Sequence, residues 1–169
     1  MQNITVRKIT IFALLLGIGI ILHFLEIYIS IPVGGYMVKP GIANIVVLFC
    51  LYLCSFRDAV FLAFTRVLVS SLFEPSITIV TICISLGGVI LSLLCMGIVY
   101  AIRSQNIVII SIAGAIAHNI GQLIVVLVFI PNKYLLYYVP LLIISGFFGG
   151  LITGWIVTLS LPKIQQPVT

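Results

Sequence analysis

Apolar residues occupy this chain in long runs, separated by short breaks that are polar or contain proline or glycine. A helix that crosses a membrane needs about 20 apolar residues, within a range of about 17–25. Six runs approach that length, and they cover residues 9–29, 41–55, 58–73, 77–102, 107–130 and 136–161. The second and third runs are the shortest. The pattern predicts an all-α integral membrane protein with six transmembrane helices in a single domain, residues 1–169.

The composition agrees with a location in the bilayer. Of the 169 residues, 63% are hydrophobic and only 7% are charged. Soluble domains are about 45–50% apolar and about 25% charged, so a soluble protein of this size lacks the charges to cover its surface. The net charge of +5 reflects only three acidic residues. The basic residues are scattered along the chain, which argues against a nucleic-acid-binding face.

Basic residues predict the orientation, because cytoplasmic loops carry an excess of lysine and arginine. Six spans place both termini on one side, and five basic residues fall there: Arg7, Lys8, Arg57, Arg103 and Lys163. Only Lys39 and Lys133 fall on the other side. We therefore expect both termini in the cytoplasm of a bacterium, with the segment 30–40 facing outward. The first apolar run is too long for a signal peptide and lacks a cleavage site, so it predicts a retained helix.

Small residues recur at every fourth position in two spans, a spacing that lets helix backbones approach closely. In the sixth span these are Gly146, Gly150 and Gly154. We interpret that stripe as packing inside the bundle, with an external contact as the alternative. Ala13 and Gly17 repeat the spacing in the first span, where internal packing and external docking both stay open.

Two cysteines, Cys50 and Cys54, share a helix face at a spacing of four residues. This spacing is compatible with two ligands of a metal ion. However, no histidine or third thiol lies near them in the sequence, and membrane helices also use cysteine as a small apolar residue. We interpret both as packing residues and expect neither a metal site nor a cofactor.

Polar side chains within membrane spans are costly and usually face a cavity or one another. Eight candidates lie within or beside the predicted spans: His23, Glu26, Lys39, Asn44, Arg66, His118, Asn119 and Gln122. The predicted topology places them between the middle of the membrane and its outer surface, so we expect them to line a cavity that opens outward. A structural role is the alternative. In that case Glu26 and Arg66 form an ion pair that fixes helix register, while His118 and Gln122 bond to neighbouring backbone.

The residues argue against an enzyme. Three acids are too few for metal-assisted phosphoryl or prenyl transfer. Asp58 is the only aspartate and lies at a predicted interface, which excludes catalysis by paired intramembrane aspartates. The chain also has no nucleotide-binding loop, so it cannot hydrolyse ATP itself. A self-sufficient proton-coupled carrier that uses His23, Glu26 and His118 stays open.

Three blocks of sequence carry a resemblance to a known family. They read "KPGIANIVVLFCLYLCSFRDAVFLAFTRVLVSSLF", "AGAIAHNIGQL" and "YYVPLLIISGFFGGLITG". They resemble the Gx transporter family, whose members are often labelled heptaprenyl diphosphate synthase component I, over about residues 10–158. The label implies prenyl-chain synthesis, yet the chain lacks the acidic motifs of such enzymes.

That family is similar in size and hydropathy to the substrate-binding S components of energy-coupling factor (ECF) transporters. The similarity implies a six-helix bundle that binds a vitamin or related molecule in its outer half, partly under the first long outer loop. It also implies docking, through a small-residue motif on the first helix, to a membrane coupling subunit driven by two ATPases. Ala13 and Gly17 match the spacing of that motif.

The leading prediction is a membrane component of an ECF-type uptake system. It captures a ligand similar to a vitamin, flavin or quinone precursor from the outer side, with the segment 30–40 as a lid. Arg66 and Lys39 suit an anionic group on the ligand. The alternative is a non-catalytic membrane subunit that anchors or regulates an isoprenoid, quinone or electron-transfer complex.

Overall fold

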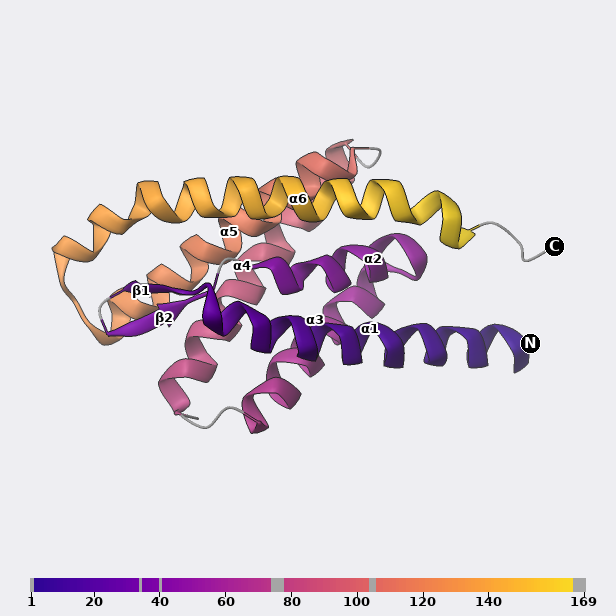
Figure 1. Ribbon diagram of the computed structural model, residues 1–169, viewed down its shortest axis with the longest axis horizontal. Coiled ribbons are helices and arrows are strands. Elements are labelled where there is room, and N and C mark those ends of the chain that lie inside the picture. Colours follow the sequence, from indigo (N-terminus) through magenta and orange to yellow (C-terminus); the bar gives the residue numbers. More distant parts are fainter. Residues whose placement is uncertain (1, 34, 40, 74–77, 104–105, 166–169) are drawn as a thin grey trace.

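The computed structural model describes residues 2–33, 35–39, 41–73, 78–103 and 106–165. Six α-helices follow one another (Figure 1): α1 (Gln2–Tyr28), α2 (Ile45–Leu53), α3 (Phe56–Leu72), α4 (Ile79–Arg103), α5 (Ile107–Phe129) and α6 (Val139–Gln165). Two short strands and two 3-10 helices complete the described part: β1 (Ile31–Val33), β2 (Tyr36–Val38), η1 (Ile42–Asn44) and η2 (Lys133–Tyr138). The predicted all-helical class is confirmed, and the small hairpin is an addition to it.

Four helical segments are long and apolar enough to cross a membrane: Val6–Tyr28, Ile79–Ile102, Ile107–Phe129 and Lys133–Pro162. The chain is therefore a multi-pass membrane protein. The other two helices are shorter. The three residues of η1 and nine of α2 rise about 20 Å together, and the 17 of α3 rise about 25 Å. A hydrocarbon core is about 30 Å thick, so six complete spans stay a prediction.

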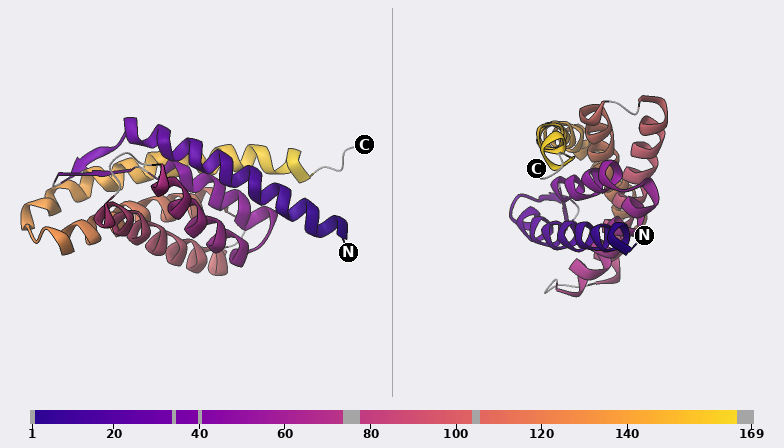
Figure 2. Two further views of the ribbon diagram at one scale, coloured as in Figure 1. Left: turned by 90° about the horizontal axis from the view of Figure 1, so that it is seen from below. Right: turned by 90° about the vertical axis from the view of Figure 1, so that its right-hand side faces the viewer.

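The short helix α2 lies in the interior of the bundle. It contacts α1 and α3 on one side and α6 on the other, while α5 packs extensively between α4 and α6 (Figures 1 and 2). Val46, Val47, Leu48, Cys50 and Leu51 are all buried. A helix that is apolar on every side must be covered by protein or lipid, and here the neighbouring helices provide that cover.

Helix α1 begins at the end of the bundle where α6 finishes, and the hairpin lies at the opposite end (Figure 1). An ion pair joins Lys8 Nζ of α1 to Asp58 Oδ2 of α3 at 3.1 Å near the first of these ends. Ser55 caps α3 there, since its Oγ accepts a hydrogen bond from Asp58 N and donates one to Asp58 Oδ2. The assignment of this end to the cytoplasm stays a prediction.

The glycine stripe of α6 packs against the backbone of α5. A Cβ atom added at Gly150 would lie 2.9 Å from both Ile112 N and Ser111 O. Gly146 and Gly154 meet α5 backbone equally closely. Internal packing, the favoured interpretation of this stripe, is therefore confirmed. In contrast, no neighbouring heavy atom lies within 4 Å of the same position at Gly17.

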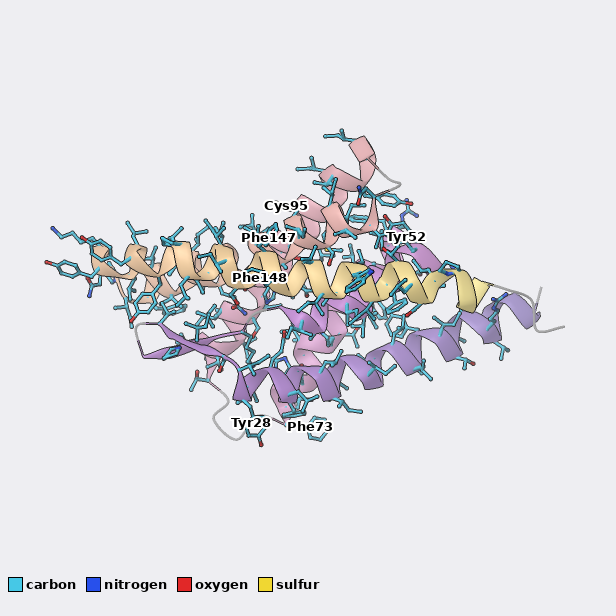
Figure 3. The ribbon with its side chains drawn as sticks, turned by 45° about the horizontal axis from the view of Figure 1, so that its top comes forward. Tyr28, Tyr52, Phe73, Cys95, Phe147 and Phe148 are labelled. Atoms are coloured by element: carbon cyan, nitrogen blue, oxygen red, sulfur yellow. The ribbon has the colours of Figure 1, made fainter. Side chains whose placement is uncertain are left out.

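Large apolar side chains cover the outward surface of α6. Phe147, Phe148 and Trp155 are exposed, and the two phenylalanines project from the helix in Figure 3. Tyr28 and Phe73 are likewise exposed at the edge of the bundle in that view. Such a surface suits lipid chains rather than water.

Two helices extend beyond the apolar spans predicted for them. Helix α1 begins at Gln2 rather than at residue 9, because the length of an apolar run locates a span but not the polar turns beyond it. Helix α6 continues through Pro162 to Gln165, although residue 161 was the predicted end. Proline lacks the amide hydrogen that would bond to the carbonyl of Thr158, and its ring crowds that carbonyl, so the last turn of α6 forms with one backbone hydrogen bond fewer.

The glycine contacts predict opposite effects of one substitution at two positions. Gly150→Leu is expected to lower the stability by about 1–3 kcal/mol or more, because the side chain meets backbone that cannot move aside. Gly17→Leu, the matched control, is expected not to lower the unfolding temperature, since the space beside it is open and leucine favours a helix more than glycine does. Thermal unfolding of both purified proteins in detergent micelles measures the difference. Equal destabilisation would contradict the described packing.

Candidate ligand-binding site

The segment between α1 and α2 folds back over one end of the bundle. Strands β1 and β2 pair antiparallel, with Val33 opposite Tyr36. Gly35, in the turn, has a φ of 86°, a conformation that favours glycine. Val33 and Val38 are fully buried in a cluster with Leu123 and Val126 of α5. The hairpin is thus held on the bundle by apolar contacts.

A first set of hydrogen bonds joins the chain after the hairpin to α1 and α5. Lys39 N donates to Gln122 Oε1 at 3.0 Å, and Gln122 Nε2 lies 3.0 Å from His118 Nε2. Lys39 Nζ lies 3.0 Å from His23 Nε2. Gln122 and His118 are four residues apart on one helix face, which places both where the chain passes over α5.

A second set surrounds η1 and involves α1, α3 and α4. Arg66 Nη2 donates to Asn44 Oδ1 at 3.2 Å, and Asn44 Nδ2 donates to Ser92 Oγ at 3.4 Å. Ala43 N donates to Glu26 Oε1 at 3.0 Å. Helix η1 therefore lies between the carboxylate of α1 and the guanidinium of α3.

Gly41 connects the two sets. A Cβ atom added there would lie 3.4 Å from His118 Cδ2 and 3.5 Å from Asn44 Nδ2. Its φ of 82° turns the chain into η1, which again favours glycine. The two sets together form one buried polar network beneath the hairpin. Its predicted members are His23, Glu26, Lys39, Asn44, Arg66, His118 and Gln122.

All eight predicted contact residues are buried, with exposed fractions of 9% or less. Seven of them meet in the polar network. Asn119 lies apart, because its Nδ2 donates to the backbone oxygen of Leu142 on α6 at 2.8 Å. It points away from its neighbour His118 because adjacent helix residues face different directions.

The ion pair between Glu26 and Arg66, which the alternative structural role requires, is not formed within 4.0 Å. An ion pair within 4.0 Å joins Lys8 to Asp58, at the other end of the bundle. Glu26 and Arg66 each bond to a neighbouring residue of η1 instead. Helices α1 and α3 are therefore joined here through η1, which bonds to both side chains, and not by a direct ion pair.

Sequence reasoning missed the contribution of α4. Ser92 is buried and accepts the hydrogen bond from Asn44, while Gly88 leaves room for the side chains of α5. A Cβ atom at Gly88 would lie 2.8 Å from both Gln122 Cγ and His118 Cε1. Gly88 and Ser92 are four residues apart on one face of α4. This pair of small residues in an apolar helix was the signal that the sequence offered.

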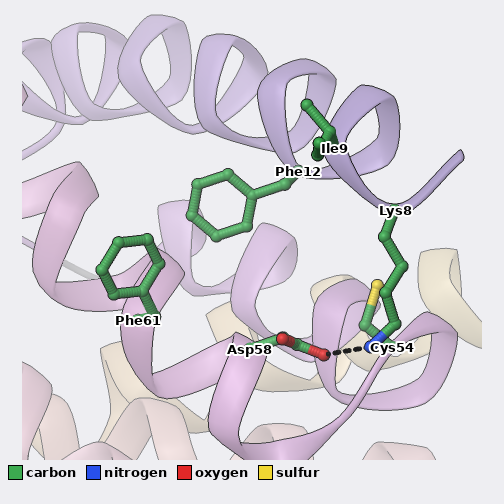
Figure 4. Close-up of a pocket in the computed structure, with 6 residues that line it drawn as sticks. All are labelled: Lys8, Ile9, Phe12, Cys54, Asp58 and Phe61. Carbon is green, nitrogen blue, oxygen red and sulfur yellow. Dashed lines mark hydrogen bonds and ion pairs between the residues drawn. The ribbon is translucent and has the colours of Figure 1, made fainter. Parts of the chain in front are cut away.

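A separate pocket of about 250 Å³ lies near the end where α1 begins, away from the polar network (Figure 4). It is lined by Lys8, Ile9, Phe12, Cys54, Asp58 and Phe61. Its charged groups are engaged in the Lys8–Asp58 ion pair. Within the described part of the chain, no three histidine, cysteine or acidic residues are grouped as metal ligands, here or elsewhere.

A family model described as heptaprenyl diphosphate synthase component I matches residues 15–160. The chain belongs to this family. The match confirms the resemblance carried by the three sequence blocks, and it contains every predicted contact residue. No curated protein and no solved structure matches the chain.

In this component I family member, the polar network is suited to hydrogen bonding. Arg66 and Lys39 supply cationic donors, Asn44 and Gln122 supply donors and acceptors, and Glu26 supplies an acceptor. Each group comes from a different part of the fold, and Lys39, Ala43 and Asn44 bond to several of them. A movement of that short segment would expose several polar side chains together.

The bond between Gln122 and Lys39 predicts a local effect of substitution. Gln122→Leu leaves a buried amide without its acceptor, at a cost of about 1–3 kcal/mol. Amide hydrogen exchange in residues 35–39 is therefore expected to accelerate roughly 10- to 100-fold, as measured by mass spectrometry in micelles. Asn119→Leu is the matched control and is expected to leave those amides unchanged, because Asn119 bonds to α6. Equal acceleration in both variants would refute the role of Gln122.

Proposed function

We propose that this protein is the membrane-embedded, small-molecule-binding component of an ECF-type uptake system. It captures a ligand similar to a vitamin, flavin or quinone precursor from the outer side. The observation that supports this role is the gathering of seven polar side chains beneath one hairpin at a single end of the bundle. Side chains that only fixed neighbouring helices would be distributed along several interfaces, as Ser111 and Thr153 are between α5 and α6.

In this proposal the hairpin and residues 39–44 form a lid, and the described conformation is the closed form. The lid's own groups occupy the polar network: Lys39 bonds to Gln122 and His23, and Ala43 bonds to Glu26. When the lid opens, these bonds break and the same side chains become free to contact a ligand. The buried valines of the hairpin then provide the apolar contribution to closure.

Binding measurements with the purified protein test the ligand site. One compound among vitamins, flavins and naphthoquinone precursors is expected to bind saturably. The double variant Arg66→Ala/His118→Ala is expected to weaken that binding roughly 100-fold or more, because each lost hydrogen bond to a charged or buried partner costs about 1.5 kcal/mol or more. Arg57→Ala, at an exposed position of α3, is the control. Absence of saturable binding, or equal binding by the double variant, counts against the site.

The first helix also carries a surface suited to docking. Ala13 and Gly17 are exposed, and no neighbouring heavy atom lies within 4 Å of a Cβ atom added at Gly17. The bundle therefore does not use this pair for its own packing. In the proposal the pair contacts the coupling subunit, which is driven by two ATPases.

A pull-down from native membranes tests the docking surface. The wild-type protein is expected to bring down a membrane coupling subunit and ATPases. Ala13→Leu and Gly17→Leu are expected to reduce their recovery tenfold or more, since a leucine prevents the close backbone approach that small residues allow. Ala101→Leu, at an exposed position of α4, is the matched control and is expected to keep full recovery.

The family description supports a second candidate from another class. Because the matching model is described as a synthase component I, the protein would be a non-catalytic membrane subunit that anchors or regulates an isoprenoid, quinone or electron-transfer complex. The same pull-down separates the two. Recovery of a prenyl synthase or redox protein, without ATPases, favours the anchoring role.

A further inference from the structure

Arg66 is a buried cation that lacks most of its hydrogen-bond partners. Its side chain is 3% exposed, and its stem packs at the place where Gly19 of α1 leaves room, with Cδ 3.0 Å from an added Cβ atom. Nη2 donates to Asn44 Oδ1 at 3.2 Å. Nε and Nη1 are buried and have no hydrogen-bond partner among the described residues. A guanidinium stays charged in proteins, so this arrangement is unfavourable unless something else compensates it.

The acidic residues described compensate that charge only in part, because Glu26 attracts Arg66 electrostatically without reaching it. Glu26 forms no ion pair with Arg66 within 4.0 Å, and its Oε1 accepts the amide of Ala43. Asp58 is bound to Lys8 at the other end of the bundle. Arg66 therefore keeps two guanidinium nitrogens, Nε and Nη1, without a hydrogen-bond partner, on a side chain that is positioned beside Gly19 and Asn44.

We propose that Arg66 binds the oxyanion group of an organic acid, a carboxylate or a phosphate, through one edge of its guanidinium, where an unpartnered nitrogen (Nε or Nη1) acts together with the second hydrogen of Nη2. Planar guanidinium donors match the oxygen spacing of both groups. The inference rests on the proposed function, because it assigns the chemical class of the ligand that enters beneath the lid. The proposal assigns the anion to Arg66 and not to Lys39, the other cation of the network. Lys39 Nζ is engaged with His23, whereas Arg66 has unused donors.

The remainder of the ligand lies on the side of α4 and α5 in this proposal. Ser92, His118 and Gln122 supply hydrogen-bonding groups there. Gly88 of α4 has no side chain, which allows His118 and Gln122 to pack directly against α4. A small organic acid with a hydrogen-bonding or aromatic body suits that neighbourhood better than a free inorganic anion.

Thermal unfolding of the purified protein in micelles tests the assignment. The probes are sodium benzoate, sodium phenyl phosphate and sodium phosphate, with sodium chloride at equal ionic strength as reference. At least one oxyanion is expected to raise the unfolding temperature saturably, by roughly 5–10 °C at 100 times its Kd. Benzoate alone indicates a carboxylate site, and phenyl phosphate alone a phosphate site. A response to inorganic phosphate equal to that of phenyl phosphate would show that the organic body adds nothing.

Substitutions assign the response to Arg66. Arg66→Met is expected to abolish it and, without anion, to unfold at the wild-type temperature or above, because it removes a charge that is compensated only in part and keeps an unbranched stem. Arg66→Lys keeps the charge but loses the planar donors, so its apparent affinity is expected to fall tenfold or more. Arg57→Met, the same substitution at an exposed position of α3, is the control and is expected to keep the full response.

Three results overturn the assignment: no shift above chloride in the wild-type protein, an unchanged response in Arg66→Lys, or an unfolding temperature lowered by more than about 5 °C in Arg66→Met. The last result would show that the guanidinium already has an internal partner. The pull-down is independent of these measurements. An anion response that depends on Arg66, without ATPases in the pull-down, keeps the anion site and removes the uptake role. The reverse pair of results keeps the uptake role and removes the anion site.

Discussion

A membrane interior offers no water to a polar group, so every such group in this bundle depends on another part of the chain. Lys39 and residues 41–44 meet much of that requirement. The amide of Lys39 bonds to α5, the amide of Ala43 to α1, and the side chain of Asn44 to α3 and α4. One short segment thus satisfies polar groups from four helices, and the arrangement of those helices around it follows from this constraint.

The same constraint accounts for the short second helix. The chain enters the bundle at Gly41, turns through a left-handed conformation and forms η1 before α2 begins. That entry places Asn44 beside Arg66 and Ser92. The three residues of η1 would otherwise add a turn to α2, which therefore begins only at Ile45. Because the nine residues that remain are apolar, α2 must be covered by protein or lipid, and the neighbouring helices provide that cover. The polar network and the buried helix therefore depend on the same chain entry.

The sequence predicted the helices well because length and apolarity determine them almost alone. The sequence also predicted that the eight polar residues would meet, since the topology restricts the depth of each in the membrane, and seven of them do. The sequence could not show that Asn119 lies outside the network. The spacing of residues shows which of them share a helix face but not which helix packs against that face, and the face of α5 that carries Asn119 packs against α6. The strands of the hairpin have three residues each, too few to show an alternating pattern. Ser92 was overlooked because small residues in an apolar helix, such as Gly88 and Ser92, also serve ordinary helix packing.

Helix α1 carries both surfaces that the proposed function requires, and they lie close together along its axis. Its inner face holds His23 and Glu26, which bond to Lys39 and Ala43, while its outer face presents Ala13 and Gly17. The six residues from Gly17 to His23 rise only about 9 Å. A helix moves as a rigid element, so a tilt of α1 against a partner would displace His23 and Glu26 and strain their bonds to the lid. Docking and lid opening would then be coupled through one helix, without a separate pathway between the two sites.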